Sequence, residues 1–155
     1  MANEALIESL NSTRVFFEKT IACFEPGDAS FAPKEGMFTV AQHIAHAAQA
    51  IEWFLEGAFR PKGMGTDFQG MEAEVRGVTE LEDAMAWWSS AMDEAVESVS
   101  NTAPEAWNER IQGEIMGGAP RHAVLSGIAD HTAHHRGALA VYARLAGRDP
   151  AMPYA

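Results

Sequence analysis

The sequence has little of what stabilises a secreted protein or anchors a chain in a membrane. It contains a single cysteine, Cys23, so no disulfide can form within the chain and nothing indicates an oxidising compartment. No apolar run approaches the roughly 18 residues that a membrane-spanning helix needs. Residues 1–10 lack the basic stretch followed by an apolar one that marks a secretory signal. These absences predict a protein of the cytoplasm with no membrane partner.

Basic side chains are also scarce. The 155 residues include 11 lysines and arginines against 22 aspartates and glutamates, which gives a formal net charge of −11. Such a surface repels the phosphates of nucleic acid and the head groups of an anionic membrane, and no basic cluster offsets it locally. We therefore expect no nucleic acid as a partner and assign the acids to solvated helix faces.

The apolar residues are dominated by leucine, alanine, methionine, phenylalanine and tryptophan, a mix that favours helices over strands. They recur at helical spacing in four stretches, 3–24, 40–59, 79–101 and 121–146. Residues 60–78 and 103–120 are rich in glycine and predict long connections after the second and third helices, the first with a short helical turn near 71–75. The sequence thus predicts an all-α four-helix bundle that forms one domain, residues 1–155.

Residues with known capping preferences mark the predicted helix ends. Thr39 is a suitable N-cap for the second helix. Thr79, with Glu82 three residues later, has the capping-box pattern and predicts the start of the third. Gly147 is expected to end the last helix, because glycine readily takes the left-handed conformation found there.

The histidines are the candidates for chemistry. Five of the six lie in two short clusters, 43–46 and 131–135. At about 100° per residue, His131 and His135 fall on the apolar stripe of the last helix, one turn apart, so their rings can converge on a single point. A buried imidazole without a hydrogen-bond partner costs about 1 to 3 kcal/mol, and one metal ion would satisfy both rings. This pair therefore predicts a metal site.

The rest of the ligand set is less directly indicated. The pair resembles half of a zincin site, but Thr132 stands where a zincin has its glutamate general base, so no zinc protease is predicted. His122 and His134 lie off the apolar stripe and are expected at the surface. The second predicted helix offers His43 or His46 as a third ligand, and periodicity alone leans slightly to His43, which lies nearer the centre of that helix's apolar stripe.

The whole chain resembles the DinB-like family of metal-binding helical bundles. The resemblance rests on four predicted helices, a histidine on the second, and the motif His-Thr-Ala-His-His-Arg-Gly at residues 131–137. In that family a threonine or serine opens the second helix, and the metal-binding histidine follows seven residues on. Counted from Thr39, that position is His46.

The resemblance implies that His46, His131 and His135 bind one divalent transition metal. Zinc and nickel are the first candidates and iron and manganese the next, because imidazole suits several such ions. His43 is then a residue of the helix face that bonds locally or to water. Arg136 could contact a carboxylate of a cosubstrate, although an ion pair with one of the chain's own acids is the alternative that we favour.

The resemblance also implies a function. Three imidazoles leave at least one metal position open to water or substrate, as in catalytic sites. Relatives in the family are S-transferases and isomerases that use bacillithiol, mycothiol or glutathione. The resemblance therefore implies a metal-dependent enzyme that acts on a small thiol and an electrophile. A homodimer is implied in the same way. The alternatives are a non-catalytic metal-binding stress-response protein and a helical interaction module whose histidines are core residues.

Overall fold

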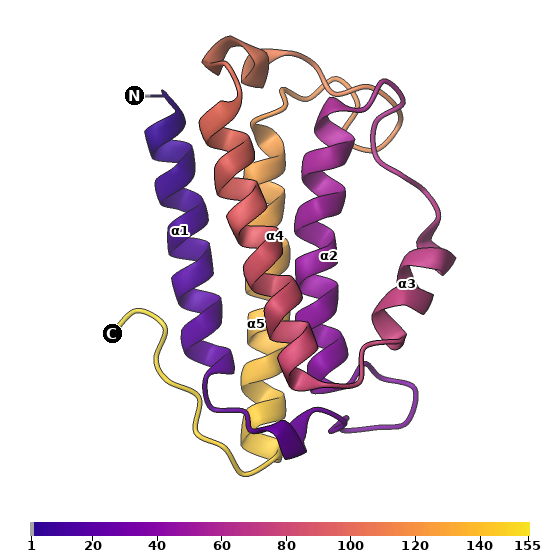
Figure 1. The fold of residues 1–155 in the computed structure, drawn as a ribbon, viewed down its shortest axis with the longest axis vertical. Coiled ribbons are helices and arrows are strands. Elements are labelled where there is room, and N and C mark those ends of the chain that lie inside the picture. Colours follow the sequence, from indigo (N-terminus) through magenta and orange to yellow (C-terminus); the bar gives the residue numbers. More distant parts are fainter. Residues whose placement is uncertain (1) are drawn as a thin grey trace.

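The structure is a computed structural model that describes residues 2–155, and these form five α-helices. Four are long and lie side by side (Figure 1): α1 (Ala2–Ile21), α2 (Val40–Phe59), α4 (Leu81–Asn101) and α5 (Ala123–Leu145). Both α1 and α2 pack against α4 and against α5. A short helix, α3 (Phe68–Arg76), stands beside α2, and two 3₁₀ turns, η1 (Pro26–Asp28) and η2 (Pro104–Asn108), lie in the connections.

The all-α prediction is confirmed, since residues 2–155 contain no β-strand and only one isolated bridge. The predicted count of four helices was wrong, because α3 occupies part of the connection after the second helix. Asp67 caps α3 by accepting a hydrogen bond from the backbone of Gly70 at 3.0 Å. The helix is attached to α2, where the side chain of Gln49 donates to the carbonyl of Met71 at 3.0 Å.

The helix ends follow the capping predictions only in part. Thr39 caps α2 as predicted, and its hydroxyl and the Gln42 side chain form a reciprocal capping box. The capping box predicted at Thr79 was wrong: α4 begins after Glu80, and the Thr79 hydroxyl donates to that carboxylate instead. Gly147 follows the end of α5 with a φ of +78°, the left-handed conformation that glycine favours.

The long helices enclose an apolar core and approach closely where the histidines lie. In the core, Phe17 of α1 stacks on Trp88 of α4 with ring centroids 4.0 Å apart. A Cβ atom at Gly127 of α5 would lie 2.9 Å from the Phe54 ring of α2, so this glycine permits the close contact of the two helices. A Cβ atom at Gly137 of the same helix would meet no atom within 4 Å, so Gly137 has no such role.

The C-terminal segment returns along the outside of α1 (Figure 1). The Tyr154 ring packs edge-on against Phe16 with centroids 5.0 Å apart, and Lys19 donates a hydrogen bond to the carbonyl of Ala155. Within residues 2–155, none of the helices combines the length and apolar composition that crossing a bilayer requires.

Candidate metal centre

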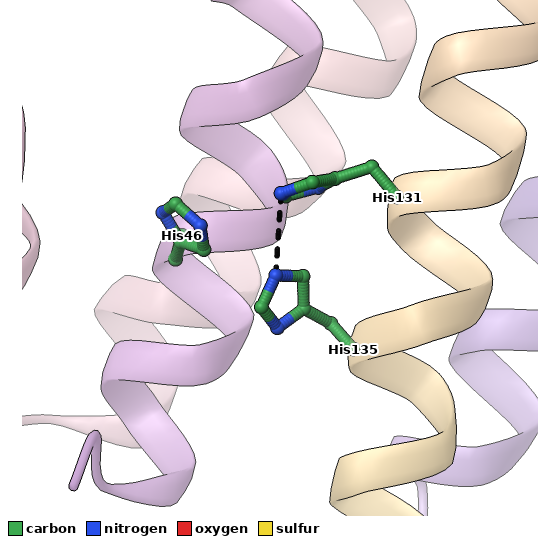
Figure 2. Close-up of side chains that lie close together, drawn as sticks. All are labelled: His46, His131 and His135. Carbon is green, nitrogen blue, oxygen red and sulfur yellow. Dashed lines mark hydrogen bonds between the residues drawn. The ribbon is translucent and has the colours of Figure 1, made fainter.

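Two helices bring three of the predicted residues together. Figure 2 shows His46 on α2 and His131 and His135 on α5, with their rings directed toward one another. One potential ligand atom of each histidine lies within 4.8 Å of those of the other two. The Nε2 atoms of His131 and His135 are 3.3 Å apart, close to the spacing of two nitrogens that each lie about 2.1 Å from one tetrahedral zinc ion.

The positions of these rings follow from local structure. His131 and His135 are one helical turn apart, so α5 alone sets their spacing. The N-cap at Thr39 defines where α2 begins, and His46 lies two turns into that helix on the side facing α5. The ring centroids of His46 and His135 are 4.8 Å apart, and those of His46 and His131 are 5.1 Å apart.

Burial keeps these imidazoles neutral. It lowers the pKa of His135 to about 2 and that of His131 to about 4, with neighbouring imidazoles adding to the effect in both cases. Burial lowers the pKa of His46 as well, against the opposing influence of Gln49 and Glu72. A neutral imidazole offers a nitrogen lone pair, which is the form that binds a metal ion.

One nitrogen in the cluster has no partner. The Nδ1 atom of His131 is buried and makes no hydrogen bond to any residue of the described chain. A buried polar atom without a partner calls for a water, an ion or a ligand to complete it. The set of three neutral nitrogen donors, two at ligand spacing, fits a divalent transition metal.

His43 lies in the same cluster but outside this group of three. It is buried, with its Nδ1 atom 3.0 Å from Nδ1 of His135 and its Nε2 atom 3.1 Å from the hydroxyl of Tyr142. The expectation of a local or water partner was therefore wrong, because both partners come from α5. Sequence periodicity contained part of the signal, since Tyr142 lies on the stripe of His135, two turns further on.

Aromatic side chains border the cluster, and reading the sequence did not single them out. The Phe38 ring, in the connection before α2, has its centroid 5.4 Å from that of His46. The Phe54 ring on α2 is 6.3 Å from that of His131. Phe38 lies outside any helical pattern, so periodicity held no sign of this contact. These rings replace water with apolar surface beside the imidazoles.

The other sequence candidates lie elsewhere. His122 and His134 are exposed, as predicted. Arg136 points to α1 and the C-terminal segment, where its Nη2 atom donates to the hydroxyl of Tyr154 at 3.0 Å and its guanidinium lies over the ring of Phe16. The ion pair that we favoured for Arg136 is not formed by any acid among residues 2–155, because these aromatic groups occupy its surroundings.

Comparison with known proteins agrees with this architecture. A similar solved structure is the crystal structure of a DinB-like protein from Bacillus cereus ATCC 10987, with a TM-score of 0.76 and 19% identity over 96% of this chain and 95% of that one. At that identity the likeness shows the fold alone. No curated protein matches the chain. The family model for the DinB family matches residues 1–155, the full sequence, and the chain therefore belongs to the DinB family.

Proposed function

We propose that His46, His131 and His135 together bind one divalent transition-metal ion, with zinc or nickel as the first candidates and iron or manganese next. The observation that carries this proposal is the convergence of three imidazoles from two helices, with ligand atoms within 4.8 Å of one another. In this proposal α1, α2, α4 and α5 are the four-helix bundle that supports the site, and α3 is an addition to it.

We further infer that the site serves an enzyme of the S-transferase or isomerase type, with a low-molecular-weight thiol and an electrophile as substrates. A metal ion held by three protein ligands has an open position and lowers the pKa of a bound water or thiol. The aromatic rings of Phe38 and Phe54 would exclude water from one side of such a thiolate. The family resemblance supports this chemistry and a homodimer, and the single cysteine supports a place in the cytoplasm.

The metal proposal is tested by elemental analysis of protein purified without a histidine tag. We expect about one equivalent of metal per chain, since each chain contributes a full set of three ligands. His46→Gln should lose it, and His122→Gln is the matched control because His122 is exposed. A wild-type protein that binds no divalent metal, even after reconstitution, would overturn the proposal.

Turnover separates an enzyme from a non-catalytic metal-binding stress-response protein. The assay combines the metal-loaded protein with bacillithiol, mycothiol or glutathione and a panel of electrophiles, and measures conjugate formed. Arg136→Gln tests whether Arg136 binds a carboxylate of the thiol substrate, because loss of that contact would raise the KM for the thiol. Loaded protein that accelerates none of these reactions would favour the non-catalytic alternative.

A further inference from the structure

A continuous chain of hydrogen bonds runs from the backbone before α2 to the candidate metal centre. The hydroxyl of Tyr142 lies 3.0 Å from the carbonyl oxygen of Phe38 and 3.1 Å from Nε2 of His43. The other nitrogen of His43 lies 3.0 Å from Nδ1 of His135. His43, His135 and Tyr142 are 9%, 6% and 3% exposed, so bulk water does not compete for these bonds.

The position of each proton in this series of hydrogen bonds follows from the Phe38 carbonyl, the one group in it that has a single possible role. The Phe38 carbonyl can only accept, so the single hydroxyl proton of Tyr142 is donated to it. The Tyr142 oxygen must then accept from His43, which places the proton of that neutral imidazole on Nε2. The Nδ1 atom of His43 is left with a lone pair and accepts from Nδ1–H of His135.

The consequence for His135 concerns its other nitrogen. A neutral imidazole carries one proton, so with Nδ1 protonated its Nε2 atom has a free lone pair. That Nε2 atom faces His131, at 3.3 Å from its Nε2. We propose that His43 and Tyr142 are positioning residues that hold His135 in its Nδ1–H tautomer and aim the Nε2 lone pair at the metal site.

The opposite assignment is less favourable. If His43 donated from Nδ1 to His135, its Nε2 atom would accept from Tyr142, and the Phe38 carbonyl would lose this donor. Because this bond is partly buried, the carbonyl that lost its donor would not be fully compensated by water. The proton of His135 would then sit on Nε2, where it blocks metal binding. The bonds of this chain thus select the tautomer that a ligand needs.

The first test needs neither a variant nor a bound metal. In metal-free protein with ¹⁵N-labelled histidine at pH 7.5, long-range ¹H–¹⁵N correlation spectra report which ring nitrogen carries each proton. We expect protonated Nδ1 at His135 and protonated Nε2 at His43. Protonated Nε2 at His135 would overturn the inference, whether or not the protein binds metal.

The second test measures the effect on metal affinity and rests on the proposed metal site. His43→Leu removes the acceptor and should weaken zinc binding about 10- to 100-fold, the usual effect of losing such a partner of a ligand. His43→Asn should restore most of the affinity, because its amide oxygen replaces Nδ1. Tyr142→Phe should shift the His43 tautomer and weaken binding by a smaller factor.

His134→Leu is the matched control, since this exposed imidazole neighbours His135 but bonds to none of these groups. Thermal unfolding of each metal-free variant separates loss of affinity from loss of fold. Wild-type zinc affinity in folded His43→Leu would overturn the inference. If no variant and no wild-type protein binds metal, the proposed function fails, while the tautomer measurement still decides the role of His43.

Discussion

Two polar clusters in this protein are completed in different ways. At the far end of α5, Arg148 forms ion pairs with Asp28 and Glu25, both at 2.8 Å. Burial acts to raise the pKa of Asp28, but the bonds from Arg148 and from the Glu25 backbone outweigh it and lower that pKa. This cluster carries both signs of charge and is satisfied from within the chain.

The histidine cluster between α2 and α5 has no such balance. Its hydrogen bonds join imidazoles to one another and to Tyr142, and no carboxylate takes part in them. One nitrogen of His131 is left without a partner among the described residues. The difference teaches that a polar cluster with matched charges is completed within the chain, whereas a cluster of neutral imidazoles with a nitrogen to spare is suited to a ligand from outside.

The largest effect is expected from removing a candidate ligand. With metal in excess, His46→Gln should lower bound metal from about one equivalent to near zero, because one of only three protein ligands is gone. His43→Gln should keep the metal content, since all three ligands remain. Elemental analysis after desalting measures both. The reverse result would show that His43, and not His46, is the third metal ligand.

Metal removal should be the next largest effect, and it depends on pH. At a hundredfold excess of metal over Kd, binding to the native state adds about 2.7 kcal/mol to the free energy of unfolding. Loaded and chelated protein should both lose stability as pH falls below about 6.5, because unfolded histidines take up protons first. The metal-dependent difference should shrink as the ligands take up protons in the folded protein, and it should be lost once His131 does so at about pH 4.

Melting curves of both forms at pH 8, 5.5 and 4 measure this. The bundle should stay folded after chelation at pH 8, because the long helices bury an apolar core of their own. Equal melting temperatures at pH 8 with metal bound would contradict the coupling. Complete unfolding by the chelator would show that the ion is structural, and would weaken the enzymatic proposal.

Breaking the ionic cluster should affect stability and leave metal binding unchanged. Arg148→Gln leaves the Asp28 carboxylate short of partners, which should lower the free energy of unfolding. Urea denaturation measures this cost, with Arg144→Gln as the matched control because Arg144 is exposed and makes no ion pair within residues 2–155. A fall in metal content of Arg148→Gln would mean that the clusters are coupled.

The smallest effect is expected at His134, which is exposed although its ring lies beside that of His135. His134→Gln should change the free energy of unfolding by less than about 0.5 kcal/mol, as surface substitutions usually do. Metal titration of the same variant should match the wild-type protein. A marked loss of affinity would extend the metal centre beyond the residues that converge between α2 and α5.

Much of the helical framework was predictable because its signals are local. The bounds of α2 agree with the prediction, since Thr39 caps it and an Arg-Pro pair follows it. The fifth helix, α3, was predicted only as a short turn near 71–75, because it is nine residues long, includes Gly70 and is held by contacts with α2. The capping box at Thr79 failed because a one-residue shift in the helix start is enough to remove it.

The candidate site was also predictable only where the signal lies within one helix. The sequence by itself determined that His131 and His135 share one face of one helix, because their spacing is a property of helical geometry alone. Only the tertiary structure decided that His46 joins them, that His43 bonds to His135 and Tyr142, and that Arg136 turns to α1. Those contacts depend on how α2 is rotated and shifted against α5, which the packing of Phe54 on Gly127 helps to set and which no periodicity within one helix contains.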